Sequence, residues 1–190
     1  TTHDYALRAT IEAALKNVDS RGAATAVLDE FKRDLSVVSA PGHFVDSLTE
    51  LCLWRFDQDA KKLVLVASTA PEQAEMEMEM EFGTGVEGLA HRRRSLVIYN
   101  RFAARSEQNS AYYVRPRNRE RDHAFLVAMP VYCPCSESVP IDERLVIGVL
   151  SLGAFEAKSK LLDLGKTRGL RQTLFDEVAS KFPSRLQRAL

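Results

Sequence analysis

The sequence lacks the features that would place a chain in a membrane or mark it for secretion. None of its apolar runs approaches the roughly 18 residues that span a bilayer. The first ten residues contain neither a basic head nor the hydrophobic segment of a signal peptide. Its three cysteines, Cys52, Cys133 and Cys135, form no disulfide framework. We therefore expect a cytoplasmic protein with reduced thiols and no membrane partner.

An excess of charge of one sign is also missing. The 190 residues contain 26 Lys plus Arg and 26 Asp plus Glu, so the formal net charge is zero. A domain that holds nucleic acid mainly through its overall charge would be basic, and we expect no nucleic-acid partner. With 45% apolar and 27% charged residues, the composition is typical of a globular chain with a packed core.

Several catalytic and metal-binding patterns are absent as well. There is no Walker loop, no H-E-x-x-H and no Ser/His/Asp order. Cys133-Pro134-Cys135 could be half of a metal site or a redox pair, but the remaining cysteine and histidines show no paired spacing. Cys52 lies in an apolar run and is more typical of a core residue than of a nucleophile. We expect no catalytic residue and no bound metal.

The residues that are present predict alternating blocks of helix and strand. Apolar residues recur at helical spacing near both ends of the chain, whereas the middle holds β-prone apolar runs separated by turns. The order predicts an α+β fold with a mainly antiparallel sheet, because it does not repeat the βαβ unit. The expected helices are 4–18, 23–38, 86–94 and 161–182, with Pro183 kinking or ending the last; the expected strands are 48–57, 61–70, 75–82, 95–99, 123–133 and 144–155.

The stretch "EMEMEMEF" (75–82) alternates strictly between apolar and acidic residues. Glutamate and methionine favour helices, but a helix would spread this alternation around its whole circumference. Period two therefore predicts an extended segment with one wet face. Its apolar face would hold Met76, Met78, Met80 and Phe82, and its wet face Glu75, Glu77, Glu79 and Glu81.

Residues 83–88 spell G-x-G-x-x-G, the fingerprint of a dinucleotide site. Such a site needs a full helix and then a parallel strand, whereas this helix would be about two turns long. Glu87 and the preceding glutamates would also oppose a pyrophosphate. We interpret the glycines as conformational: Gly83 and Gly85 allow positive φ where the strand turns into the helix, and Gly88 packs closely.

Four motifs in this order resemble the core of a GAF domain. The first is the glycine step Gly83-x-Gly85-x-x-Gly88-x-Ala90, which leads to a short strand, 95–99. The third matches residues 125–131 with a proline at 130, and the fourth matches 146–152 with a glycine at 148. In place of a frequent acidic residue after the second motif, the chain has Asn100. The resemblance covers about residues 24–190.

This resemblance implies a GAF-like, profilin-like architecture. A central antiparallel sheet of about six strands would carry helices from both termini on one face, and a ligand pocket and lid loop on the other. We expect a single domain over 1–190, with N-terminal helices in 1–38 and a C-terminal helix in 166–190. Related domains pair through such helices, which implies a homodimer through 5–18 and 167–190. An effector domain would lie elsewhere in a longer chain.

The implied pocket lies between the short helix, the strand after it and the loop 100–121. Gly85, Val86 and Ile98 are therefore candidate ligand-binding residues, and Trp54 either lines the pocket or fills the core. From His91 to Arg121 the chain has nine arginines and two glutamates. Arginine and tyrosine suit an anionic, aromatic ligand, so further candidates are Tyr112, Tyr113, Arg115, Arg117 and Arg119. Alternatively, these arginines pair with the acidic strand and form a solvated surface.

Other branches of the family need residues that this chain lacks at matching positions. No Asn-Lys follows the last long strand, as in members that bind cyclic nucleotides, and the lid has no cysteine for a bilin. The cysteines also do not border the pocket as in free methionine sulfoxide reductases. We therefore expect no enzyme, and leave the ligand and any cofactor unassigned.

The resemblance implies a sensory or regulatory domain. It would bind a small molecule and signal to an attached effector through its terminal helices, by favouring one packing over another. Two alternatives stay open. One is a non-catalytic dimerisation scaffold without a ligand, and the other is a thiol redox sensor or enzyme that uses Cys133 and Cys135.

Overall fold

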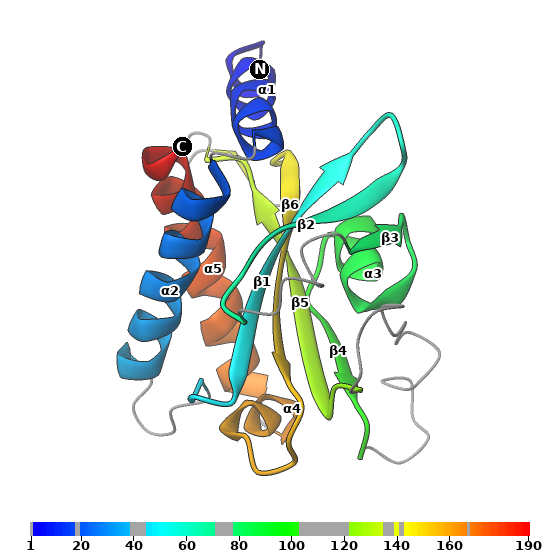
Figure 1. The fold of residues 1–190 in the computed structure, drawn as a ribbon, viewed down its shortest axis with the longest axis vertical. Helices are drawn as coiled ribbons and strands as arrows, with labels where there is room; N and C mark the ends of the chain where they lie inside the picture. The colour runs from blue at the N-terminus through cyan, green and yellow to red at the C-terminus, as the bar shows by residue number, and fades with distance from the viewer. Residues whose placement is uncertain are drawn as a thin grey trace.

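The computed structural model describes residues 2–17, 20–38, 45–70, 78–102, 122–134, 139–140, 143–166 and 168–190. Helices and strands follow one another in the predicted order (Figure 1). The strands are β1 (Thr49–Asp57), β2 (Lys62–Ser68), β3 (Glu79–Glu81), β4 (Val97–Asn100), β5 (Phe125–Tyr132) and β6 (Val146–Ala154). The helices are α1 (Thr2–Lys16), α2 (Ser20–Val38), α3 (Gly85–Arg93), the 3-10 turn η2 (Lys160–Leu162), α4 (Asp163–Lys166) and α5 (Arg168–Ala189).

The strands form one twisted sheet in the order β3-β2-β1-β6-β5-β4, and every neighbouring pair is antiparallel (Figure 1). The predicted β1–β2 hairpin is present, with a shift in register between Leu53 and Trp54. This architecture confirms the α+β class and the six-stranded antiparallel sheet. It contains none of the parallel crossovers of a dinucleotide-binding fold within the described strands.

Helices α2 and α5 pack on one face of the sheet, which we call the helix-side face (Figure 1). The apolar stripe predicted for α2, which includes Phe31 and Leu35, is buried there. The rings of Phe31 and Phe182 meet edge to face between the two helices, with centroids 5.1 Å apart. The helical period of the sequence therefore identified which side of each helix faces the core.

The terminal helices use their apolar stripes within the chain itself. Ile11 and Leu15 of α1 are buried in the helix-side core, as are Leu174 and Val178 of α5. A homodimer through 5–18 and 167–190 stays a prediction, and it would have to use other side chains of these helices.

The central strand β1 divides its side chains between the two faces. Leu51 and Leu53 belong to the helix-side core, whereas Cys52 and Trp54 belong to a second buried cluster on the opposite face. Alternation along a strand produces this division. Helix α3 packs on that opposite face, against β4, β5 and β6, and we call it the α3-side face.

The acidic stretch is extended where it can be described. Met78 and Met80 are buried, whereas Glu79 and Glu81 are exposed, so period two correctly predicted the two faces of β3. Residues 71–77 lie outside the described residues. Phe82 is 40% exposed in the turn that follows.

The glycines of the G-x-G-x-x-G stretch shape the turn from β3 into α3. Gly83 and Gly85 have φ of 77° and 65°, in the left-handed region that favours glycine. A Cβ on Gly88 would lie 3.0 Å from the backbone nitrogen of Gly83 and 3.1 Å from the carbonyl oxygen of Glu81. The conformational interpretation of all three glycines is confirmed, and α3 is only nine residues long.

The C-terminal region differs from the single helix predicted over 161–182. It consists of η2, α4 and α5, and α5 continues through Pro183 to Ala189. Proline costs a helix one backbone hydrogen bond and crowds the preceding turn. Here Phe182 and Leu186 are fully buried on either side of it, and their burial opposes that cost.

Candidate functional site

The α3-side face carries a group of buried polar side chains, which we call the polar cluster: Glu50, Cys52, Ser68, His123 and Ser151. Glu50 and Cys52 come from β1, Ser68 from β2 and Ser151 from β6, while His123 lies two residues before the start of β5. Each is at most 7% exposed. Burial of a polar group is unfavourable unless it is hydrogen-bonded, so the contacts within the cluster determine how it can exist.

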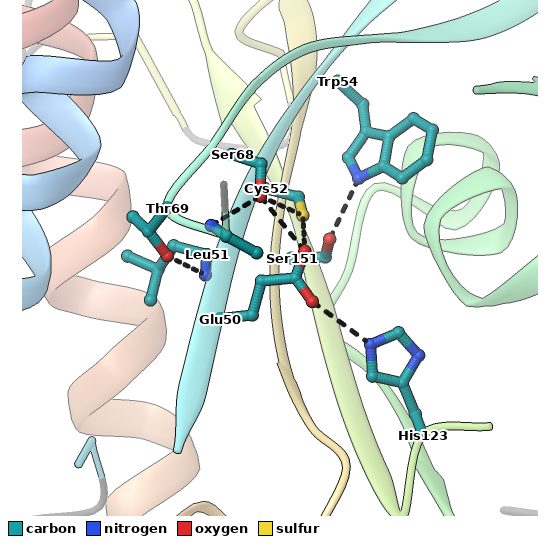
Figure 2. A network of polar contacts seen from close by, with 9 residues as sticks. Glu50, Leu51, Cys52, Trp54, Ser68, Thr69, His123 and Ser151 are labelled. Atoms are coloured by element: carbon teal, nitrogen blue, oxygen red, sulfur yellow. Dashed lines mark hydrogen bonds and ion pairs between the residues drawn. The ribbon is translucent and has the colours of Figure 1, made fainter. Parts of the chain in front are cut away.

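Glu50 lies at the centre of these contacts (Figure 2). One oxygen of its carboxylate, Oε1, accepts hydrogen bonds from Cys52 Sγ at 3.0 Å and from Ser68 Oγ at 3.1 Å. The other oxygen, Oε2, lies 3.7 Å from His123 Nε2. A carboxylate is rarely buried without such partners. In this arrangement the thiol of Cys52 is the hydrogen-bond donor and the carboxylate is the acceptor.

His123 is held in place by the end of β6. Its ring stacks on Phe155, with centroids 4.4 Å apart and planes 16° from parallel. A Cβ on Gly153 would lie 2.5 Å from His123 Nε2, closer than atoms can approach. Glycine at 153 therefore provides the space in which the imidazole lies against the sheet and reaches Glu50.

Trp54 continues the same face toward α3. Its indole Nε1 donates a hydrogen bond to Ser151 Oγ at 2.9 Å (Figure 2). The side chain is 2% exposed and belongs to the second cluster, where it joins Cys52 to the apolar residues. The hydrogen bond fixes the orientation of the indole at the boundary between the polar and apolar parts of this face.

The part of the face beneath α3 is apolar. It is filled by Leu63, Leu65, Met80, Val86, Leu89 and Val97. At its edge, the ring of His91 lies against Phe56, with centroids 4.6 Å apart, and against Phe82 at 5.4 Å. Neither ring nitrogen of His91 has a hydrogen-bond partner among the described residues. Burial, together with the positive charges of Arg8 and Arg94, lowers the pKa of His91 to about 4.

The predicted site residues are distributed unevenly over this structure. Gly85 and Val86 begin α3 on the α3-side face, and Val86 is fully buried. Ile98 lies on the opposite face, in the helix-side core, because its neighbours Val97 and Tyr99 take the α3-side positions of β4. The remaining candidates, Tyr112, Tyr113, Arg115, Arg117 and Arg119, lie outside the described residues.

The sequence interpretation missed the polar cluster. The alternation that places Cys52 and Trp54 on one face of β1 also places Glu50 there, one step earlier. Nothing local marks Ser68, His123 or Ser151, because they meet Glu50 only through the order of strands in the sheet. The one feature of the sequence that could have pointed to the polar cluster is Glu50 itself, a glutamate at an inward-facing position of an apolar strand.

Metal ligands do not gather in the described part of the chain, where no group of three or more His, Cys, Asp or Glu side chains could hold a metal ion. Cys133 is buried at the end of β5. Cys135 lies outside the described residues, so the proposed thiol pair stays a prediction. No described helix is both long and apolar enough to cross a membrane.

The described architecture matches solved structures, although no protein-family model and no curated protein matches the sequence. The GAF domain of an Acinetobacter phosphoenolpyruvate-protein phosphotransferase aligns with a TM-score of 0.51 and 15% identity, over 86% of this chain and 92% of that one. The chain has a GAF-like fold. The corresponding GAF domain from Coxiella burnetii aligns with a TM-score of 0.48 and 16% identity, over 88% and 99% of the two chains. The predicted resemblance is thus confirmed for the fold.

The expectation that this chain is not an enzyme is corrected by the same comparison. A type II free methionine-R-sulfoxide reductase from Thermoplasma acidophilum aligns with a TM-score of 0.47 and 11% identity, over 85% of this chain and 95% of that one. Two further similar structures are also of such reductases. Enzymes therefore occur among the structures similar to this GAF-like fold, and the absence of familiar catalytic motifs was not a sufficient reason to exclude catalysis.

Proposed function

We propose that this chain is a small-molecule-binding regulatory domain whose ligand contacts the polar cluster on the α3-side face. The polar groups of the ligand would hydrogen-bond to the cluster near Glu50 and His123, and its apolar part would lie toward Trp54. The bound ligand would favour one arrangement of the terminal helices and so signal to an attached effector. The cytoplasm is the compartment that we propose for it.

The observation that supports this proposal is the gathering of Glu50, Ser68, His123 and Ser151 from separate segments onto one buried face. A face that served only to fill the core would be largely apolar, as the cluster packed against α2 and α5 on the helix-side face is. A buried polar group needs well-placed partners, because one left without them costs about 1–3 kcal/mol, and more when it is charged. A dimerisation scaffold without a ligand has no evident use for polar side chains that three strands and the segment before β5 bring together on one buried face.

Native mass spectrometry tests the proposal directly. The purified protein should carry a small molecule whose mass disappears on denaturation, and Glu50→Gln should lower its occupancy about tenfold or more, because a hydrogen bond to a charged group contributes roughly 1.5–3 kcal/mol. Glu79→Gln is the matched control, since Glu79 is exposed on β3 and pairs with Lys62 at 2.7 Å. Equal occupancy in all three proteins would overturn the assignment of the site.

A second candidate function is catalysis at the same cluster. The carboxylate of Glu50 and the imidazole of His123 lie 3.7 Å apart, and such pairs of groups transfer protons in enzymes. The test is to incubate the extracted small molecule with the protein and follow its mass over time. Turnover by the wild type that is lost in Glu50→Gln would favour an enzyme, whereas release of an unchanged molecule would favour a sensor.

A further inference from the structure

The polar cluster lies at the end of the sheet where the C-terminal helices begin. Glu50, near the start of β1, pairs with Gly153, near the end of β6. Phe155, which stacks on His123, is the first residue after β6, and η2 begins five residues later. Figure 1 shows α4 at the same end of the molecule as the start of β1. The chain therefore passes from the cluster into α4 and α5 within a few residues.

Asp46 joins these segments. Its Oδ2 accepts a hydrogen bond from the backbone N–H of Lys160 at 2.8 Å, and its Oδ1 accepts one from Ser159 Oγ at 3.1 Å. On its own side, Oδ1 also accepts bonds from the N–H of Leu48 at 3.0 Å and from Thr49 Oγ1 at 3.1 Å. One carboxylate, four residues before Glu50, thus ties the start of β1 to the first turn of η2. We call Asp46, Ser159 and Lys160 the junction.

A second contact connects the His123 side of the cluster to α4. Phe125 begins β5 two residues after His123 and is fully buried. A Cβ on Gly165 of α4 would lie 3.2 Å from the ring of Phe125, which is tighter than ordinary packing. The backbone of Ala124, between His123 and Phe125, donates to Ala154 at 2.8 Å. Short hydrogen-bond and packing contacts therefore connect the Glu50 side of the cluster to η2 and its His123 side to α4.

We propose that the junction couples the polar cluster to α5. A rearrangement of Glu50 would shift the start of β1, loosen or tighten the bonds from Asp46 to Ser159 and Lys160, and so change how firmly α5 docks. This inference rests on the proposed function for its purpose, because the ligand would supply the rearrangement. The coupling itself is a property of the chain and can be measured without a ligand.

The test is a double-mutant cycle read by hydrogen–deuterium exchange of α5. Glu50→Gln should accelerate exchange in α5 by roughly tenfold, because loosening of the docked helix lets it open locally. Asp46→Asn should accelerate it as well, and the double variant should exchange no faster than Asp46→Asn alone, because the path is then already broken. Glu79→Gln, at the far edge of the sheet, should leave exchange in α5 unchanged.

Two outcomes would overturn the proposal. In the first, Glu50→Gln alters hydrogen–deuterium exchange in β1 and β6, whereas α5 exchanges at its wild-type rate. In the second, the effects of Glu50→Gln and Asp46→Asn on exchange in α5 are additive, as for sites that do not interact. If Asp46→Asn fails to fold, Ser159→Ala serves in its place: it keeps the carboxylate, and it removes both the hydrogen bond from Ser159 to Asp46 and the cap that the same hydroxyl gives to the N–H of Leu161. A protein that carries no small molecule but shows the cycle would count against the proposed function and leave the coupling intact.

Discussion

The two faces of the sheet are built from the same strands but are filled in different ways. On the helix-side face, β1 contributes Leu51 and Leu53 to a cluster of apolar side chains. On the α3-side face, the same strand contributes Glu50, Cys52 and Trp54, and each of them makes a polar contact to a neighbouring strand. Apolar contacts need no precise partner, whereas buried polar groups do. The difference is the basis for our proposal that the helix-side face maintains the fold and the α3-side face binds the ligand.

The largest expected effect comes from the helix-side face. Phe182→Ala should lower the free energy of unfolding by about 3–5 kcal/mol, because it leaves a cavity against Phe31 in a fully buried position. Urea denaturation followed by circular dichroism measures the change. The occupancy of the small molecule, measured under conditions where the variant stays folded, should remain close to that of the wild type. A loss of occupancy in the folded variant would show that the two faces are not separate in function.

The next effect concerns His91, at the edge of the α3-side face. Its folded-state pKa of about 4 lies below the ordinary 6.5, so the unfolded chain takes up the proton first as the pH falls. The stability that depends on neutral His91 is complete above about pH 6.5 and is lost progressively toward pH 4, by roughly 3 kcal/mol in all.

His91→Phe tests this account, because phenylalanine keeps the contacts with Phe56 and Phe82 and has no nitrogen to leave without a partner. The variant should be at least as stable as the wild type at pH 7. It should also lose less stability between pH 6.5 and 4, measured by chemical denaturation at each pH. Identical pH dependence in the two proteins would mean that His91 is not buried in its neutral form.

Gly153→Ala should affect the polar cluster at a moderate cost in stability. The added Cβ would lie 2.5 Å from His123 Nε2, so the imidazole must move away from Glu50, at about 1–3 kcal/mol. The small molecule should be lost as well. Gly169→Ala in α5 is the matched control, since a Cβ there meets nothing within 4 Å, and this variant should be as stable as the wild type or slightly more so. A Gly153→Ala protein that retains its small molecule would contradict the placement of the site.

The smallest expected effect concerns the arginines within residues 103–121, a stretch that lies outside the described residues. If Arg115 helps to hold an anionic part of the ligand, Arg115→Ala should weaken binding about tenfold to a hundredfold. If the stretch is only a solvated surface, affinity should not change, because exposed ion pairs contribute about 0–1 kcal/mol. Titration calorimetry with the extracted molecule measures the difference. Arg101→Ala, at an exposed position before this stretch, is the matched control.

Much of the fold could be predicted because its determinants are local. The positive φ of Gly83 and Gly85, the alternation of Met78 and Met80 with glutamates, and the helical stripe of α2 are each visible within a few residues. The site is not local in this sense. Ile98 was predicted to line it, yet one residue of shift along β4 places a side chain on the other face. Glu50, Ser68, His123 and Ser151 come together only through the strand order, which no single segment encodes.

We propose that a small molecule binds against the polar cluster, and Trp54, the single tryptophan of the chain, reports on this binding. The indole Nε1–H of Trp54 is bonded to Ser151 within this face, so its proton gives one isolated resonance in a ¹H–¹⁵N spectrum. When the extracted small molecule is returned to the stripped protein, this resonance should shift in proportion to occupancy, and Glu50→Gln should require about tenfold more ligand for the same shift. Saturation of the protein with an unmoved indole resonance would place the ligand elsewhere and contradict the account.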